Sequence, residues 1–264
     1  MADWLQHLEL GYNALEHGST LAADAHFLAA YEAAPDDPVA CYAYARSLAR
    51  VENWLEAEPL LKKAFSLDPA LLDAACEWVR VKVILGVDFD MTLAFLDQLE
   101  ACHRDEYLIP LTKIELFLRV GDEVRSSSAL DSARKKGAPQ EHLLVAQAKI
   151  EQLLGLKFVQ TGDLERAQEQ FILASELDTS WAAPHINRGV TQEKMGSPGD
   201  ARESYLRGLE LEPLSSVALY NLANLHARQK EAAEASRYMR VLLEVHPDYP
   251  GAQKLALEIV EMER

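Results

Sequence analysis

The sequence predicts an all-α fold in which helical hairpins stack in a row. In residues 148–179, apolar residues recur at helical spacing on both sides of Thr161-Gly162-Asp163, as in a helix, a tight turn and a second helix. The same pattern returns thirty-four residues further on, and again after that. Such a period indicates a repeat array, in which each hairpin buries its apolar face against the next.

Small and bulky positions alternate between the two helices of each unit. Gly155 in the first helix, with Ala167 and Ala174 in the second, would let the helices approach, and Phe158 and Phe171 would fill the space between them. The bulky position of the second helix is apolar in all seven units, which carry there Phe27, Leu61, Phe95, Leu130, Phe171, Tyr205 and Met239.

The turn position favours a left-handed backbone, which glycine adopts most easily. Five of its seven residues are glycine, and the full set is Gly18, Glu52, Gly86, Gly121, Gly162, Gly196 and Lys230.

These features resemble the tetratricopeptide repeat, with Leu10-Gly11, Ala23 followed by Phe27, and the closing Pro35 matching its signature in the first unit. The resemblance implies a right-handed αα-hairpin superhelix, here of seven repeats and a C-terminal capping helix, fifteen helices in all. The repeats are predicted to start near residues 4, 38, 72, 107, 148, 182 and 216.

The first half of the chain follows this pattern with two departures. Hairpins are expected at 4–34 and from Pro38 onward, and Pro59 lies early enough in its helix to be tolerated. The third and fourth units depart from it, because Val79 and Ile114 replace the small residue of the first helix.

The fourth and fifth repeats are spaced by 41 residues instead of 34 or 35, and the extra residues stay apolar-periodic. We therefore expect one lengthened helix over roughly 140–160. A joint is predicted near 136–140, at Lys136-Gly137-Ala138-Pro139, and an ordinary loop between repeats is the alternative.

The last segment, 250–264, offers a single helix where an eighth repeat would begin. Leu255, Ile259 and Met262 recur at helical spacing, as expected for a capping helix that covers the final hairpin. The chain is thus interpreted as one solenoid over 1–264.

Composition and charge narrow the classes of function. The chain is 49% hydrophobic and 26% charged, with a formal net charge of −16, which opposes binding to nucleic acid or anionic membranes. The sequence has no run of eighteen apolar residues that would suggest membrane insertion, and its start lacks a secretory signal pattern. We therefore expect a cytoplasmic protein.

No motif predicts catalysis. The sequence has no glycine-rich phosphate loop, no paired-cysteine metal motif and no nucleophile elbow, and its eight histidines are scattered. We therefore expect no enzyme activity, no cofactor and no metal site.

Because the first helices line a concave groove in the family, the resemblance places function on that surface. Asn187 and Asn221 occupy the same groove position one repeat apart, and a primary amide can both donate to and accept from a peptide unit. Asn side chains that only bridge adjacent helices are the alternative. The predicted partner-binding residues are Asn187, Tyr220, Asn221, Asn224, Arg228 and Lys194.

A second candidate lies in the N-terminal half, where an aromatic and several bases could meet an acidic or aromatic ligand. Alternatively, Asp73 and Glu77 on the neighbouring helix neutralise Arg46 and Arg50 within the fold. The residues are Tyr42, Arg46, Arg50 and Arg80.

The sequence thus predicts a non-enzymatic adaptor that binds an extended segment of a partner protein in its groove. Groove positions carry seven bases and six acids, a net +1, so the other surfaces carry −17 of the total −16. We therefore expect the groove to bind a neutral or basic segment. The alternative is a self-assembling scaffold, or an assembly or secretion chaperone, acting through an exposed N-terminal repeat. That alternative, which implies a homo-oligomer, rests on Trp4, Leu5, Leu8 and Tyr12.

Overall fold

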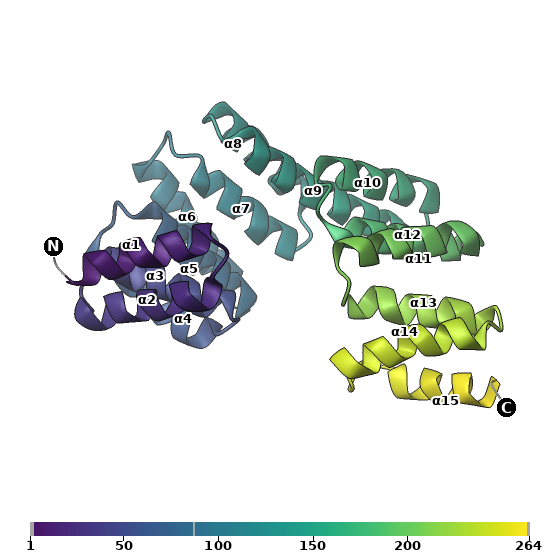
Figure 1. Cartoon of the computed structure of the whole chain (residues 1–264). Coiled ribbons are helices and arrows are strands. Elements are labelled where there is room, and N and C mark those ends of the chain that lie inside the picture. Colours follow the sequence, from purple (N-terminus) through teal and green to yellow (C-terminus); the bar gives the residue numbers. More distant parts are fainter. Residues whose placement is uncertain (1–2, 87, 263–264) are drawn as a thin grey trace. The chain divides into compact units, whose positions relative to one another are not determined.

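The computed structural model describes residues 3–86 and 88–262. Over these residues the chain forms fifteen α-helices and no strand, which confirms the all-α fold class (Figure 1). Successive helices pair as antiparallel hairpins. The helices gather into two compact units, Met1–Ala138 and Pro139–Arg264. Flexing near 136–140 stays a prediction.

The first unit holds four helical hairpins, and its helices begin close to the repeat starts expected from the sequence. They are α1 (Asp3–Glu16), α2 (Thr20–Ala33), α3 (Pro38–Arg50), α4 (Trp54–Leu67), α5 (Leu72–Ile84), α6 (Phe89–Cys102), α7 (Leu108–Arg119) and α8 (Glu123–Lys135).

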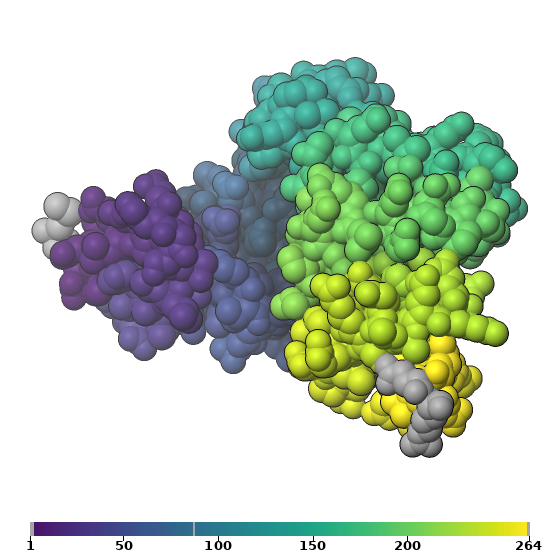
Figure 2. All heavy atoms as spheres, turned by 45° about the vertical axis from the view of Figure 1, so that its right-hand side comes forward, coloured from purple at the N-terminus to yellow at the C-terminus, as the bar shows by residue number. Residues whose placement is uncertain are grey.

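The second unit holds three hairpins and a final single helix, and Figure 2 shows its atoms as one continuous surface from green to yellow. Its first helix has 22 residues and ends at Gly162, which confirms the lengthened helix. The helices are α9 (Gln140–Thr161), α10 (Leu164–Leu177), α11 (Ala182–Lys194), α12 (Pro198–Leu211), α13 (Ser216–Arg228), α14 (Ala232–Val245) and α15 (Ala252–Met262).

Glycine lets the two helices of three hairpins pack in direct contact with an aromatic ring. A Cβ atom on Gly155 would lie 2.5 Å from Cε1 of Phe171, so no larger residue fits without movement. The same relation joins Gly11 to Phe27 and Gly189 to Tyr205. All three rings are buried, which confirms the small-against-bulky packing.

All seven turn residues have a left-handed backbone, including the two that are not glycine. Glu52 has φ 60° and Lys230 has φ 63°, while the five glycines lie between 70° and 83°. The turn geometry therefore belongs to the hairpin itself, and glycine only makes it easier to adopt.

The third hairpin differs from the others. Its second helix, α6, packs less against α5 than α7 does, and its fully buried residue is Leu96. The expected bulky residue, Phe95, is only partly buried and packs edge-on against Phe65 and Trp78. The predicted core position was therefore wrong by one residue, since Leu96 and not Phe95 is fully buried.

The single helix α15 covers the last hairpin. Ala252, Leu255 and Ile259 are buried against Met239 and Leu242 of α14, as a capping helix requires. Met262 is 39% exposed and does not contribute as expected. Residues 263 and 264 of the expected helix lie outside the described residues.

Candidate functional site

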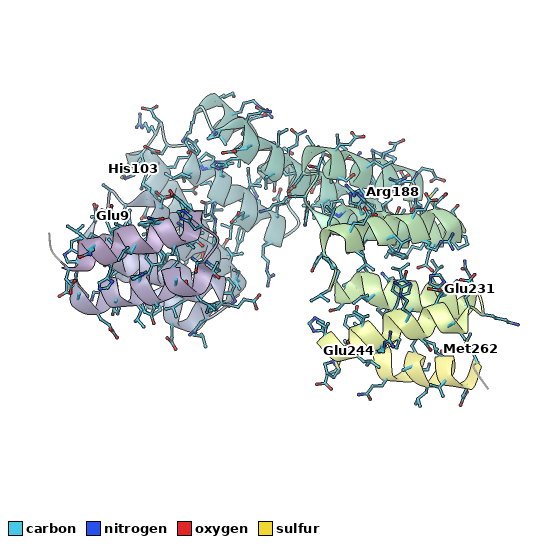
Figure 3. The ribbon with its side chains drawn as sticks, in the orientation of Figure 1. Glu9, His103, Arg188, Glu231, Glu244 and Met262 are labelled. Atoms are coloured by element: carbon cyan, nitrogen blue, oxygen red, sulfur yellow. The ribbon has the colours of Figure 1, made fainter. Side chains whose placement is uncertain are left out.

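The first helices of the hairpins in the second unit are neighbours in space. Helix α9 contacts α11, and α11 contacts α13, so their side chains share one wall. Asn187 lies on α11, directly before Arg188 in the sequence, and Figure 3 labels Arg188; Asn221 and Asn224 lie on α13. All three asparagines are partly exposed, and their amides make no hydrogen bond to any described residue. These amides can therefore bond to a ligand.

An ionic network lies at the end of the same wall. The buried Tyr205 hydroxyl donates to Oε2 of Glu193 at 2.8 Å, and Arg228 donates to Oε1 of Glu193 at 3.0 Å. Burial, followed by the Glu193 carboxylate, raises the pKa of Tyr205 well above its usual value. Arg228 stays 66% exposed at its side chain, and Lys194 is exposed beside Glu193. Two cationic groups thus remain open to a ligand.

Tyr220 belongs mainly to the packing of the cap. Its ring lies 5.3 Å from that of Tyr249, measured between centroids, and its hydroxyl lies 2.9 Å from the place where a Cβ of Gly251 would stand. Tyr220 is thus the one of the six predicted residues that packs against the segment leading into the capping helix α15. Only part of its side chain is exposed to solvent.

The arginines of the N-terminal candidate have mostly different partners from those expected. Arg50 pairs with Asp24 of α2 at 2.5 Å, and Arg80 bonds both Glu77 and Glu115 at 2.9 Å. The predicted neutralisation of Arg46 and Arg50 by Asp73 and Glu77 is therefore wrong among the described residues, where Arg50 pairs with Asp24 and Glu77 pairs with Arg80. Asp24 is closer to Arg50 because α2 packs directly on α3.

Arg46 is the exception in that group. Its guanidinium carbon lies 5.7 Å from the centre of the Tyr42 ring, and the side chain is exposed. Burial raises the pKa of Tyr42 to about 12, against the opposing charge of Arg46. Only one of the three arginines is thus available to an acidic ligand.

The exposed N-terminal face is smaller than expected. Leu8 is only 6% exposed and packs with Ala23 and Phe27, because it lies one turn before Gly11 on the side facing α2. Trp4 is partly buried in the same cluster. Leu5 and Tyr12 remain, at 43% and 40% exposure.

The Tyr205–Glu193 bond is the functional detail that sequence reasoning missed. A signal existed, because the bulky position holds Phe in the first and fifth units but Tyr in the sixth, and a buried hydroxyl needs a partner.

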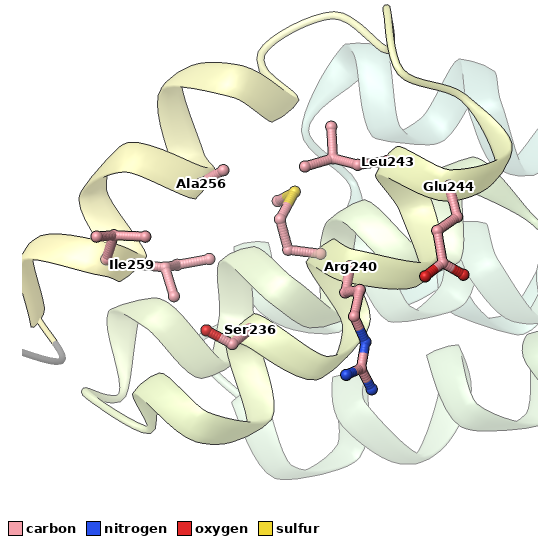
Figure 4. A pocket seen from close by; sticks show the side chains of 8 residues that line it. Ser236, Arg240, Leu243, Glu244, Ala256 and Ile259 are labelled. Atoms are coloured by element: carbon pink, nitrogen blue, oxygen red, sulfur yellow. The ribbon is translucent and has the colours of Figure 1, made fainter.

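The structure also shows a mostly apolar hollow of about 390 Å³ between α14 and α15 (Figure 4). Its lining comprises Ser236, Met239, Arg240, Leu243, Glu244, Ala256, Ile259 and Val260.

Across residues 3–86 and 88–262, no three His, Cys, Asp or Glu side chains come together as metal ligands would. None of the helices in the described part has both the length and the apolarity of a membrane span.

Three comparisons relate the chain to known proteins. Residues 186–252 match the family model described as tetratricopeptide repeat. Human protein O-mannosyl-transferase TMTC3 is 35% identical over 95 residues, which are 36% of this chain and 10% of that protein.

Two solved structures share the fold over nearly the whole chain. One is a chain of the APC/C hetero-tetramer Cut9-Hcn1, with a TM-score of 0.65 and 16% identity. The match covers 98% of the present chain and 46% of that chain. The other is a tetratricopeptide repeat protein from Parabacteroides merdae, with a TM-score of 0.63 and 12% identity. The match covers 97% of the present chain and 98% of that protein. Residues 186–252 thus match the tetratricopeptide repeat in sequence, and the described helices of the chain have the fold of tetratricopeptide-repeat arrays.

Proposed function

We propose that the protein is a non-enzymatic adaptor that holds an extended segment of a partner protein in the groove of the second unit. A tetratricopeptide-repeat fold is in general a protein-interaction scaffold. The groove of this proposal is the wall formed by α9, α11 and α13. We assign binding to Asn187, Asn221 and Asn224, with Lys194, Arg228 and the accessible part of Tyr220 at its margins.

The observation that carries the proposal is the pair of unbonded amides one repeat apart. Neighbouring helices lie about 10 Å apart, and three extended residues span roughly the same distance. Asn187 and Asn221 can thus each bond one peptide unit of the same extended chain, through one donor and one acceptor. Neither amide bridges two helices among the described residues, which weakens the structural alternative.

The partner segment is proposed to be neutral or basic. A chain of formal charge −16 attracts basic proteins at long range, and salt reduces that attraction over a Debye length of about 8 Å at physiological ionic strength. The groove itself then supplies the amide hydrogen bonds, which are indifferent to the sequence of the segment.

The test is to select peptides on the intact protein from a random library and measure their affinities for variants. Replacing Asn187 and Asn221 by Ala should weaken the binding of a groove peptide by about 1–3 kcal/mol, because the hydrogen bonds of both amides to the ligand are lost. Asn13→Ala, at an exposed asparagine of α1, is the matched control and should leave the affinity unchanged. Peptides that bind both variants equally well would refute the site.

Self-assembly through the N-terminal repeat is the second candidate, and Leu5 and Tyr12 are the observation in its favour. The burial of Leu8 reduces the apolar area available to it. Light scattering over a range of concentrations separates the two candidates. A dimer that dissociates on Leu5→Glu would favour self-assembly, and a strict monomer would exclude it.

A further inference from the structure

In the first unit, every hairpin places a large apolar residue at the start of its second helix. The position is the same in each repeat, three residues after the left-handed turn residue. These residues are Leu21, Leu55, Phe89 and Val124.

Three of these four side chains lie almost entirely in solvent. Leu21 is 85% exposed, Leu55 78% and Val124 73%, and the three are among the most exposed large apolar side chains of the described residues. Phe89 is partly buried between Phe117 and Arg125, so it joins α6 to α7 and α8.

A second set of apolar residues occurs in three of these hairpins, at the residue that directly follows the first helix, whereas the first hairpin has His17 there. It consists of Val51, Leu85 and Val120, which are 64%, 37% and 51% exposed. We call the two sets together the turn edge, comprising Leu21, Val51, Leu55, Leu85, Phe89, Val120 and Val124.

The hairpin fold does not require apolar residues at the turn edge. The second unit has the same hairpins, yet the position of the first set there holds Glu165, Gly199 and Ala233. The second set there is Thr161, Met195 and Gln229. Met195 is thus the one large apolar residue among these six positions of the second unit. Exposed aliphatic side chains in water gain nothing for the folded state, so a surface that is far more apolar in one unit than in the other points to binding.

The charges around the turn edge define what could bind. The four turn segments, 16–22, 50–56, 84–90 and 119–125, carry seven carboxylates and three arginines. Two of the arginines already have carboxylate partners, since Arg50 pairs with Asp24 and Arg125 with Asp122. The carboxylates are Glu16, Glu52, Glu56, Asp88, Asp90, Asp122 and Glu123.

We propose that the turn edge of the first unit binds a basic amphipathic helix of another protein. Each of the four hairpins offers one or two apolar residues at the turn edge, and carboxylates lie in the same turn segments. A helix lying across the hairpins would present its apolar stripe to these residues, with Lys or Arg on its flanks facing the carboxylates. This surface is separate from the groove, and the two proposals stand or fall independently.

The test uses a synthetic helical peptide of about 21 residues, with Leu at helical spacing and Lys elsewhere, and a second peptide with Glu in place of Lys. Fluorescence anisotropy at physiological salt measures binding to the intact protein. The Lys peptide should bind saturably and the Glu peptide should not.

The decisive variant replaces Leu21, Leu55 and Val124 by Ser, which removes apolar surface without changing the charge. Binding of the Lys peptide should weaken about tenfold or more. The matched control replaces three exposed apolar residues of the second unit, Met195, Leu214 and Leu257, by Ser and should bind as the unchanged protein does. Far-UV circular dichroism melts establish that both variants fold, as the exposure of the replaced side chains leads us to expect.

Three outcomes would overturn the proposal. They are equal loss of affinity in both triple variants, equal binding of the Glu peptide, and the absence of saturable binding. A dimer of the unchanged protein that dissociates on replacing Leu21, Leu55 and Val124 would also overturn it, since the occupant would then be a second copy.

Discussion

At the residue scale, hairpin packing depends on matching the sizes of two side chains. Where the first helix offers glycine, the second supplies a buried aromatic ring, as at Gly155 and Phe171. Where it offers alanine, as at Ala45 and Ala223, the partner column holds Leu61 and Met239. A larger side chain on one helix is thus matched by a smaller one on the other, so that the pair fills a similar volume in each hairpin.

Gly155→Ala should therefore lower the free energy of unfolding by about 1–3 kcal/mol, because the new methyl group would clash with the Phe171 ring. Urea denaturation measures this. Gly199→Ala is the control, since Gly199 lies in α12 with open space around it and no positive φ, and it should be neutral or slightly stabilising.

The double variant Gly155→Ala with Phe171→Leu should recover part of the loss, because it reproduces the Ala–Leu pairing of Ala45 and Leu61. If the two substitutions instead destabilise additively, the two residues do not share one volume, and the interpretation of the hairpin packing is wrong.

At the scale of elements, α6 is held in place by charge in addition to apolar packing. Glu100 accepts from Lys113 at 2.5 Å and from Lys136 at 2.8 Å, and Lys113 also bonds Asp97 at 2.6 Å. Both lysines are largely buried, and together these bonds tie α6 to α7 and to the end of α8. These ion pairs therefore hold α6 in place although it makes few contacts with α5, the first helix of its hairpin.

The ion pairs of Glu100 make the first unit sensitive to acid. Burial opposes ionisation of its carboxyl, but the hydrogen bonds from Lys113 and Lys136 outweigh burial and lower its pKa below 4.5. A carboxyl with a lowered pKa in the folded state contributes stability above its unfolded pKa. That contribution is lost as the pH falls through the folded value.

Glu100→Gln should lower the free energy of unfolding at pH 7 by about 1–3 kcal/mol, because two partly buried ammonium groups lose their shared partner. It should also flatten the decline in stability below about pH 4.5. Glu141→Gln, at a carboxylate 81% exposed, is the control and should change neither. Equal acid sensitivity of the Glu100→Gln variant and the unchanged protein would contradict this account.

At the scale of the whole molecule, the division after Ala138 separates two units that each bury their own core. The apolar clusters of the first unit and those of the second share no residue. A repeat array allows this independence, because its stability is the sum of contacts between neighbours.

We therefore expect residues 1–138 and 139–264 to fold as separate fragments. Circular dichroism of each fragment should show helical content close to that of the same residues in the whole chain, with a cooperative melt. A cut within the first unit, between Ala70 and Leu71, is the control and should leave at least one half poorly folded, because α4 packs on α5. A fragment 139–264 that is unfolded alone would contradict the division.

The sequence alone determined the features of this protein that repeat. The helices, the left-handed turns at Glu52 and Lys230, the pairing of Gly155 with Phe171 and the lengthened α9 all follow from patterns within one hairpin or one period. Such patterns are local, so residue spacing is enough to predict them. The positions of Asn187 and Asn221 on the candidate groove follow from the same period, whereas their lack of hydrogen bonds could be read only from the structure.

Only the tertiary structure decided how side chains from different helices meet. In the structure, Arg50 pairs with Asp24 and not with Asp73, and Leu8 is buried. Leu96, not the predicted Phe95, is buried in the core, and Tyr205 bonds to Glu193. Each of these outcomes depends on the distance and rotation between two packed helices. A shift of one residue in that packing changes every partner, and residue spacing within one helix carries no information about it.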